Sequence, residues 1–448
     1  MKILILIMCV LTSSVGRAEI DSRVVDQVIA GAINRVLELQ SKVDGVYHQG
    51  EWPIQISTNG VASSIGLGKP GAEYEDPSSF VTALTHNLLA EIYLGDNSYN
   101  QIPDALRMAR DSFKYYESKE GYNFWPLYKS SLGFKARRPK YLPTAFFLKG
   151  FENIPADSDT HSGVALAKKL GTLVDTNLSQ SSYNFDVELS KIFAYTDTNR
   201  PNSHPYNAQL SYKNTGAFLT WLHRESGFVD PIAVILPSFF GTRIPFGIND
   251  VDCVVNGNIL RAISYSENKQ NYPLESSCNY LKKVVANQDF GKCGLYYSSR
   301  YYLHYLLSEA QSLGISCLDE VMPKLQKDIL QNYDPAQNGW FSSKKDLDIV
   351  HSNLFSVRAL MLTGSAHDQI LKPVVDASII RILKFAKQDS KGNYYWEKGN
   401  FFNANPYLRY DAVWKSESYT TALAVNTLVA YKFWLSNKNL SQVSVNTF

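Results

Sequence analysis

The chain carries almost no excess charge of either sign. Its 448 residues include 44 Lys and Arg against 42 Asp and Glu. Two of the basic residues, Lys2 and Arg17, lie in a leader expected to be removed, which leaves 42 of each sign. Nucleic acids and anionic membrane surfaces are bound by concentrated basic surfaces. The balanced composition therefore argues against either partner.

Long apolar runs are also missing, apart from one near the start. Residues 3–11 follow Lys2 and are apolar, and Gly16 and Ala18 supply the small residues that precede a signal-peptide cleavage site. The run is too short to cross a bilayer. We expect residues 1–18 to be a signal peptide, and the mature chain to be secreted or periplasmic with no membrane span.

Cysteine is scarce, and no two cysteines have the CxxC spacing of zinc or redox sites. One of the five, Cys9, lies in the leader. The remaining even number in an exported chain favours two disulfides, with three possible pairings. These cysteines are Cys253, Cys278, Cys293 and Cys317.

Nucleotide and hydrolase motifs are absent as well. The chain has no Walker A loop, no GxGxxG after a predicted strand, no HExxH and no GxSxG. The sequence therefore predicts no cofactor.

What the chain does have is a repeated unit of roughly fifty residues, a period typical of stacked architectures. Each copy runs from a helix through a turn of glycine and aromatic residues into a second helix. Such units cannot bury their apolar faces alone, so they imply one closed repeat domain. The turns are marked by Asp44-Gly45 with Trp52, Gly121 to Trp125, Gln288-Asp289 with Gly294 to Tyr296, Gln337 to Trp340, and Gln388-Asp389 with Gly392 and Trp396.

Two sets of helices follow from this pattern. The amphipathic set that precedes the turns should form an outer ring: 21–40, 103–117, 206–224, 276–287, 319–332 and 373–387. The set that follows the turns is richer in small and apolar residues and should form an inner ring: 78–94, 159–171, 250–264, 298–313, 348–362 and 416–434. We expect a single domain over 19–448, interrupted by insertions near 172–205 and 225–249.

These turns, together with the closing segment from Trp414 to Ala422, resemble the squalene cyclase and protein prenyltransferase superfamily. The resemblance implies an all-α fold, an (α/α)6 toroid of six helical hairpins, with a ligand cavity at the end where the inner helices begin. Helical-toroid glycoside hydrolases and polysaccharide lyases share this architecture, so the fold alone does not fix the activity.

A spaced acidic pair opens three of the predicted inner helices. The first Asp of each pair suits a helix cap, whereas the second falls in the first turn and should face a common rim. The first members, Asp157, Asp250 and Asp346, are candidate ligand-binding residues, and the second members, Asp159, Asp252 and Asp348, are candidate catalytic residues.

Asp252 is the strongest of these candidates on the resemblance. Cyclases that protonate an alkene carry an Asp-x-Asp-Asp signature whose middle Asp is the proton donor, and Asp252 matches that position. The last Asp of the signature is Cys253 here. Protonating an alkene requires a strong carboxylic acid in a dry aromatic cavity.

Two further interpretations use other side chains. Asp348 and His351 match the Asp-x-x-His part of the prenyltransferase zinc pattern, but an exported chain would not meet the cytosolic substrates, so we expect no metal and a structural His351. Alternatively, Arg300, Tyr301 and His304 could bind sugars, because sugar rings stack on aromatic side chains. Aromatic residues at helical spacing are also common in protein cores.

The sequence therefore predicts either an enzyme that uses cavity carboxylates on a lipid, isoprenoid or carbohydrate, or a non-catalytic protein that binds such a ligand. We expect a monomer. Because Cys253 and Cys293 lie at the starts of consecutive inner helices, and Cys278 and Cys317 at the starts of consecutive outer helices, we expect the disulfides Cys253–Cys293 and Cys278–Cys317.

Overall fold

The structure is a computed structural model that describes residues 20–129, 135–145, 153–175, 183–225, 242–341, 349–405, 408 and 410–442. The expected residues Asp346 and Asp348 lie outside this part of the chain.

Six helices form a closed inner ring. Each contacts the next, and the last contacts the first, so the ring has no free end. Their residues are buried on almost every side, which explains why they are apolar around most of their circumference rather than along one stripe. The inner helices are α4 (Ser79–Gly95), α6 (Ser158–Val174), α9 (Cys253–Ser264), α11 (Tyr301–Ser312), α13 (Ile349–Thr363) and α15 (Glu417–Leu435). This arrangement confirms the (α/α)6 toroid.

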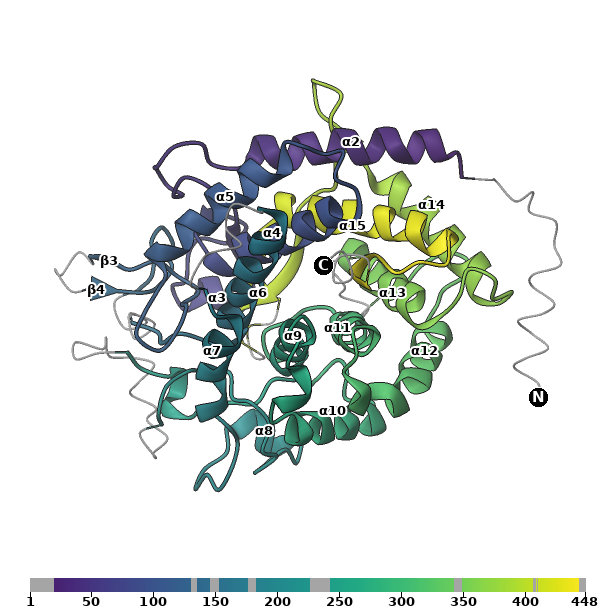
Figure 1. Ribbon diagram of the computed structural model, residues 1–448. Coiled ribbons are helices and arrows are strands. Elements are labelled where there is room, and N and C mark those ends of the chain that lie inside the picture. Colours follow the sequence, from purple (N-terminus) through teal and green to yellow (C-terminus); the bar gives the residue numbers. More distant parts are fainter. Residues whose placement is uncertain are drawn as a thin grey trace.

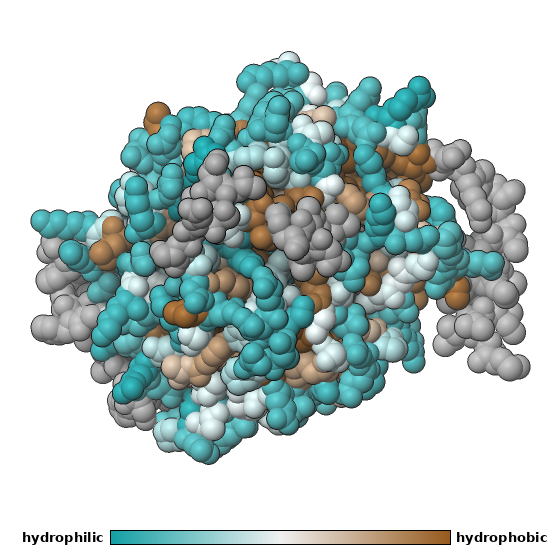
Figure 2. Space-filling view, viewed as in Figure 1, coloured by the Kyte–Doolittle hydropathy of each residue, from teal (hydrophilic) through white to brown (hydrophobic). Residues whose placement is uncertain are grey.

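Amphipathic helices surround this ring (Figure 1). They are α2 (Ser22–Leu39), α5 (Ile102–Ser112), α10 (Glu275–Asn287), α12 (Met322–Gln331) and α14 (Leu371–Phe385). Helix α2 packs on α15, so the first and last hairpins are neighbours, as closure requires. Figure 2 shows that the rim of this face is mostly hydrophilic, with hydrophobic residues in patches nearer the middle.

The tryptophans of the repeated turns hold the outer helices at their C-terminal ends. The indole nitrogens of Trp52, Trp340 and Trp396 each donate a hydrogen bond of 2.8 Å to a carbonyl near the end of the preceding outer helix. All three rings are fully buried. A carbonyl in the last turn of a helix has no partner within the helix, so the indole satisfies it while the ring fills the seam between repeats.

The predicted outer helix 206–224 is wrong. Only α8 (Pro205–Gln209) is helical there, because Ser211 and Asn214 adopt left-handed backbone conformations that end the helix. The outer position beside α6 is instead taken by α7 (Phe185–Ser190) and the 3-10 turn Lys191–Ala194. The segment 172–205, which we expected to be an insertion, therefore includes the outer element of that repeat.

A small antiparallel sheet, not expected from the sequence, joins the two ends of the chain. It contains β1 (Gln55–Thr58), β2 (Glu73–Glu75), β7 (Gly399–Asn403) and β8 (Ala412–Ser416), in the order β2-β1-β8-β7. Ile56 pairs with Trp414 across the first and last repeats. The sheet thereby places Trp414 and Phe402 next to residues from the start of the chain.

Both expected disulfides are present, with Cα–Cα distances of 5.4 Å for Cys253–Cys293 and 6.1 Å for Cys278–Cys317. The first joins the start of α9 to the loop before α11. The second joins α10 to the 3-10 turn Ser316–Val321. Two disulfides fit an extracellular protein. Within the described residues, no helix is both long enough and apolar enough to cross a bilayer.

The outer-ring disulfide provides a direct test of how the toroid is stabilised. Replacing Cys278 and Cys317 together by alanine should lower the free energy of unfolding by about 2–4 kcal/mol, because the unfolded chain gains freedom. Urea denaturation under oxidising conditions measures this. In reductant the variant and the parent should converge, and a difference that persists would assign the loss to packing instead.

Candidate active site

A cavity lies at the end of the ring where the inner helices begin. Its empty volume is about 1310 Å3, including its opening to solvent. The inner helices contribute lining residues at or just before their first turns, including Phe80 of α4, Asp159 and Thr160 of α6 and Val255 of α9. The cavity therefore lies where the sequence predicted it.

Aromatic rings form much of the cavity wall. Phe402 lies at their centre, 5.3 Å from Phe124 and 5.9 Å from Tyr296 in stacked geometry, and 5.2 Å from Trp414 edge to face. Aromatic faces carry negative electrostatic potential and attract cations. Such a wall suits an apolar ligand that develops positive charge. The aromatic lining residues are Phe80, Phe124, Trp125, Trp221, Tyr296, Phe402 and Trp414.

Asp159 is the carboxyl whose environment is most unusual for an ionised group. It lies in the first turn of α6, is 4% exposed, and lines the cavity. Its Oδ1 atom is buried and has no hydrogen-bond partner among the described residues. Burial, and then the charges of Asp157 and Asp252, raise the pKa of Asp159 well above its usual range, while a hydrogen bond from Asn258 lowers it. The side chain is thus kept protonated to a higher pH than an ordinary carboxyl.

The other cavity carboxyls are hydrogen-bonded. Asp157 caps α6 by accepting from the Thr160 backbone N–H at 2.6 Å, and burial raises its pKa to about 7. Asp250 accepts hydrogen bonds from the Thr220 hydroxyl, from the indole of Trp221 at 3.2 Å and from the hydroxyl of Tyr296 at 2.7 Å. Both line the cavity, as expected for ligand-binding candidates.

Asp252, the favoured acid in the sequence, serves as a helix cap. One oxygen accepts the N–H groups of Val254 at 2.6 Å and Val255 at 3.1 Å, and the other accepts those of Leu295 at 2.5 Å and Tyr296 at 3.3 Å. Burial and Asp250 raise its pKa to about 7, while these backbone donors lower it. Asp252 is fully buried but is not among the described residues that line the cavity. The geometry therefore makes Asp159 the better candidate acid.

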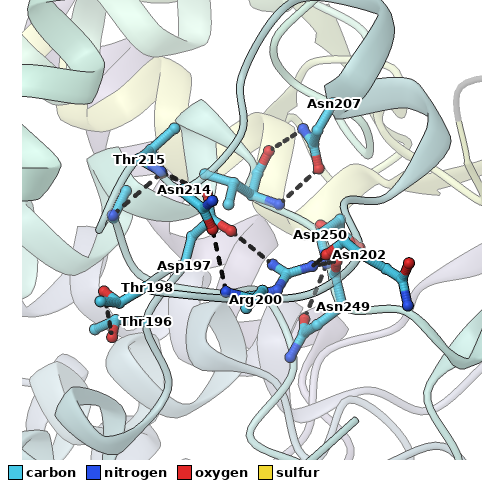
Figure 3. A network of polar contacts seen from close by, with 12 residues as sticks. Thr196, Asp197, Thr198, Arg200, Asn202, Asn207, Asn214, Thr215, Asn249 and Asp250 are labelled. Carbon is cyan, nitrogen blue, oxygen red and sulfur yellow. Dashed lines mark hydrogen bonds and ion pairs between the residues drawn. The ribbon is translucent and has the colours of Figure 1, made fainter. Parts of the chain in front are cut away.

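Side-chain amides hold the acidic segment before α9 in place (Figure 3). The Asn207 amide donates to the Val251 carbonyl at 2.8 Å and accepts the Val251 N–H at 3.0 Å. Asn249 makes the same pair of bonds to the backbone of Trp221, at 2.8 and 3.0 Å. Arg200 donates to the Asn249 carbonyl at 2.6 Å. The Asn side chains thus bond both the N–H and the C=O of a residue, as the backbone of a neighbouring strand would.

Arg200 is itself fixed by two ion pairs, at 3.0 Å to Asp197 and 2.9 Å to Glu225, and all three side chains are largely buried. Asp197 also accepts from both the N–H and the hydroxyl of Thr215. The described residues around Arg200, between Asp197 and Glu225, therefore support the segment that carries Asp250.

The remaining predicted residues lie away from the cavity lining. His351, a ligand-binding candidate, is buried, with Nε2 at 3.0 Å from the Thr420 hydroxyl. His304 and Arg300 share Asp328, at 3.0 Å and 2.9 Å respectively, and Tyr301 packs against the His304 ring. The structure does not bring these three side chains to the cavity.

No three His, Cys, Asp or Glu side chains lie in an arrangement suited to a metal ion within the ranges described above. Asp157 and Asp250 of the lining accept hydrogen bonds from backbone, hydroxyl and indole donors.

Several residues in or beside the cavity were not identified from the sequence as site candidates. Asp76, just before α4, is not among the described residues that line the cavity, but it accepts hydrogen bonds from the indoles of Trp125 and Trp414, which do line it. Asp76 does not belong to a spaced Asp pair, and the cap of α4 is Ser78. Arg138, His204 and Trp221, which line the cavity, lie in irregular chain with no repeat signature.

No protein-family model and no curated protein matches the sequence. Solved structures do match in fold. The type II terpene cyclase MstE from Scytonema is 16% identical, with 91% of this chain and 98% of that chain covered and a TM-score of 0.53. A substituted form of MstE in complex with geranylgeranyl dihydroxybenzoate, its substrate, is 15% identical, with 91% and 97% covered and a TM-score of 0.54.

Cellobiose 2-epimerase from Spirochaeta thermophila is 11% identical, with 91% of this chain and 95% of that chain covered and a TM-score of 0.50. The chain has a terpene-cyclase-like toroid fold. Identities this low show the fold alone, so the activity has to be argued from the cavity.

The contribution of the two Asn207–Val251 hydrogen bonds can be tested by measuring the free energy of unfolding. Asn207→Ala leaves the buried N–H and C=O of Val251 without these partners, which should lower the free energy of unfolding by about 1–3 kcal/mol. Lys213→Ala, at an exposed neighbouring position, is the matched control and should change it by less than about 0.5 kcal/mol. Equal urea midpoints for the two variants would show that the Asn207–Val251 hydrogen bonds do not contribute to stability.

Proposed function

We propose that this protein is an acid-initiated cyclase or isomerase that protonates an apolar, alkene-containing lipid, with Asp159 as the proton donor. The observation that carries the proposal is a buried carboxyl with a raised pKa and an unpartnered oxygen beside an aromatic cavity. General acids of this kind have perturbed pKa values and lie within reach of the substrate.

In the proposed first step, the O–H bond of Asp159 breaks and the π electrons of the alkene form a new C–H bond. This leaves a carboxylate on Asp159 and a carbocation on the substrate. An internal alkene can then attack the cation, which closes a ring, and loss of a proton ends the reaction. The net change is an isomerisation, so no other reactant is consumed.

The cavity wall would stabilise the cation in two ways. The faces of Phe402, Trp414 and their neighbours attract positive charge without acting as nucleophiles. Asp250, which accepts hydrogen bonds from three side chains on the same cavity, would serve as the counter-charge or as the acceptor of the final proton. Apolar walls also exclude water, which would otherwise trap the cation.

The comparisons support this proposal at the level of fold, since MstE is a type II terpene cyclase that binds an isoprenoid-bearing substrate. The likeness to cellobiose 2-epimerase keeps a sugar substrate as the second candidate. The mostly apolar lining speaks against it, because sugar hydroxyls need many polar partners. We further propose that residues 1–18 direct export, in keeping with the two disulfides.

Turnover should depend on Asp159 more than on any other carboxyl. On a panel of geranyl, farnesyl and geranylgeranyl alcohols, acids and aryl conjugates, with products followed by mass spectrometry, Asp159→Asn should reduce the rate about 10²–10⁴-fold. Asp111→Asn, an exposed control on α5, should retain the parental rate. An Asp159→Asn variant as active as its parent would rule out the assigned acid, and no conversion by the parent would favour a ligand-binding protein.

The same substitution should raise stability in a pH-dependent way. A carboxyl whose folded pKa is raised contributes stability that is present below its unfolded pKa and is lost as the pH rises toward its folded pKa. Asp159→Asn removes this dependence, so the variant should exceed the parent in urea midpoint near pH 7 and differ less near pH 4. An equal difference at both pH values would show that Asp159 is not buried as a neutral acid.

A further inference from the structure

Asp76 is a buried carboxyl whose side-chain partners among the described residues are two indoles. It lies between β2 and α4 and is 0% exposed. Trp125 Nε1 donates to both of its oxygens, at 3.1 and 3.0 Å, and Trp414 Nε1 donates to Oδ2 at 2.5 Å. Trp125 precedes α6 and Trp414 lies in β8, near the end of the chain, and both line the cavity.

No cationic side chain pairs with Asp76 in the part of the chain that the structure describes. The titratable groups that feel its charge are the phenols of Tyr47 and Tyr116, and burial raises the pKa of both above the ordinary value. Tyr116 donates its hydroxyl to Glu51 at 2.6 Å. Burial raises the pKa of Asp76 to about 7, while the two indole donors lower it. No cation in the described part of the chain therefore neutralises the charge of Asp76, and the carboxyl changes its protonation state near neutral pH.

A carboxylate that accepts an indole N–H places negative charge at the edge of the ring, and this increases the attraction of the ring for a cation. The effect is large where the surroundings are apolar, because charges are weakly screened there. One carboxylate that accepts from two indoles increases the attraction of both rings for a cation, and it also fixes the orientation of the rings.

We propose that Asp76 is a positioning residue that orients Trp125 and Trp414 and, when ionised, makes the cavity a binding site for hydrophobic organic cations. This deepens the proposed function, because the same wall would face a carbocation, but the binding itself does not require turnover. Asp76 need not touch the ligand, since its charge acts through the indoles.

The test compares two probes of the same shape, benzyltrimethylammonium and its neutral carbon analogue neopentylbenzene. At pH 8 the parent protein should bind the cation at least about tenfold more tightly than the neutral probe, and this preference should shrink at pH 6 as Asp76 and the cavity carboxyl Asp157 take up protons. In Asp76→Asn, which retains an acceptor oxygen, the preference at pH 8 should be several-fold smaller than in the parent, and Asp76→Glu should recover part of it. Titration with each probe, followed by tryptophan emission, gives the affinities.

A second measurement needs no variant and no ligand. The tryptophan emission of the parent protein should change with a midpoint near pH 7, as the indole N–H groups exchange a carboxylate acceptor for a carboxylic acid. Emission independent of pH from 5 to 9, or equal affinity for the two probes at pH 8, would overturn the proposal even if Asp76→Asn fails to fold. Cation preference without turnover on any isoprenoid would leave this inference standing and reject the cyclase; turnover without cation preference would do the reverse.

Discussion

The cavity end of the structure depends on which buried carboxyls find hydrogen-bond donors where the inner helices begin. A carboxyl in an apolar interior must find hydrogen-bond donors, share a charge or take up a proton. The free backbone N–H groups of helices α6 and α9 supply donors to Asp157 and Asp252, which are thereby engaged as caps. Asp159 lies in the first turn of α6, beyond the cap, and receives none of these donors at Oδ1. Its pKa is therefore raised, which favours the protonated form that the proposed function requires.

The supports of this site come from distant parts of the chain and are held by closure of the ring. The sheet pairs the first repeat with the last, which brings Trp414 to Asp76 and Phe402 to Phe124. The disulfide Cys253–Cys293 ties the start of α9 to the loop whose Leu295 and Tyr296 N–H groups bind Asp252. A cavity built in this way is ordered by the fold as a whole rather than by one loop.

Much of the architecture could be predicted because the sequence contains a repeated unit, and each copy folds into a similar pair of helices. The inner and outer helices, the closure between 21–40 and 416–434 and both disulfides follow from periodic apolar residues and from which end of the ring each cysteine occupies. The helix at 206–224 could not be separated from an irregular segment, because Asn207 and Asn214 make backbone-directed contacts that no periodicity reveals.

The site was predicted only in part, for a related reason. A spaced acidic pair indicates a capped helix, but which member of the pair is the cap depends on the exact start of that helix. Helix α6 begins at Ser158, so its second Asp falls inside the helix, whereas α9 begins at Cys253, so its second Asp is the cap itself. A shift of two residues thus exchanges the roles of Asp159 and Asp252. Asp76 could not be predicted because its two hydrogen-bond donors, Trp125 and Trp414, are far from it in the sequence.

The direction of the inner helices imposes a last constraint on any cation in the cavity. Each helix directs the positive end of its dipole, equivalent to roughly half an elementary charge, toward the cavity end. That field favours anions and opposes a carbocation, so a toroid with bare helix ends would be a poor catalyst of cationic cyclisation. Asp157 and Asp252 offset the field at α6 and α9, and the aromatic wall, with Asp76 behind it and Asp250 beside it, supplies negative potential where a substrate would lie. At the opposite end of the ring, Arg261 bridges Glu91 at 2.5 Å and Glu309 at 2.9 Å, so acidic and basic side chains compensate one another there. The charges that oppose the helix dipoles therefore lie at the cavity end, which is left able to accept positive charge.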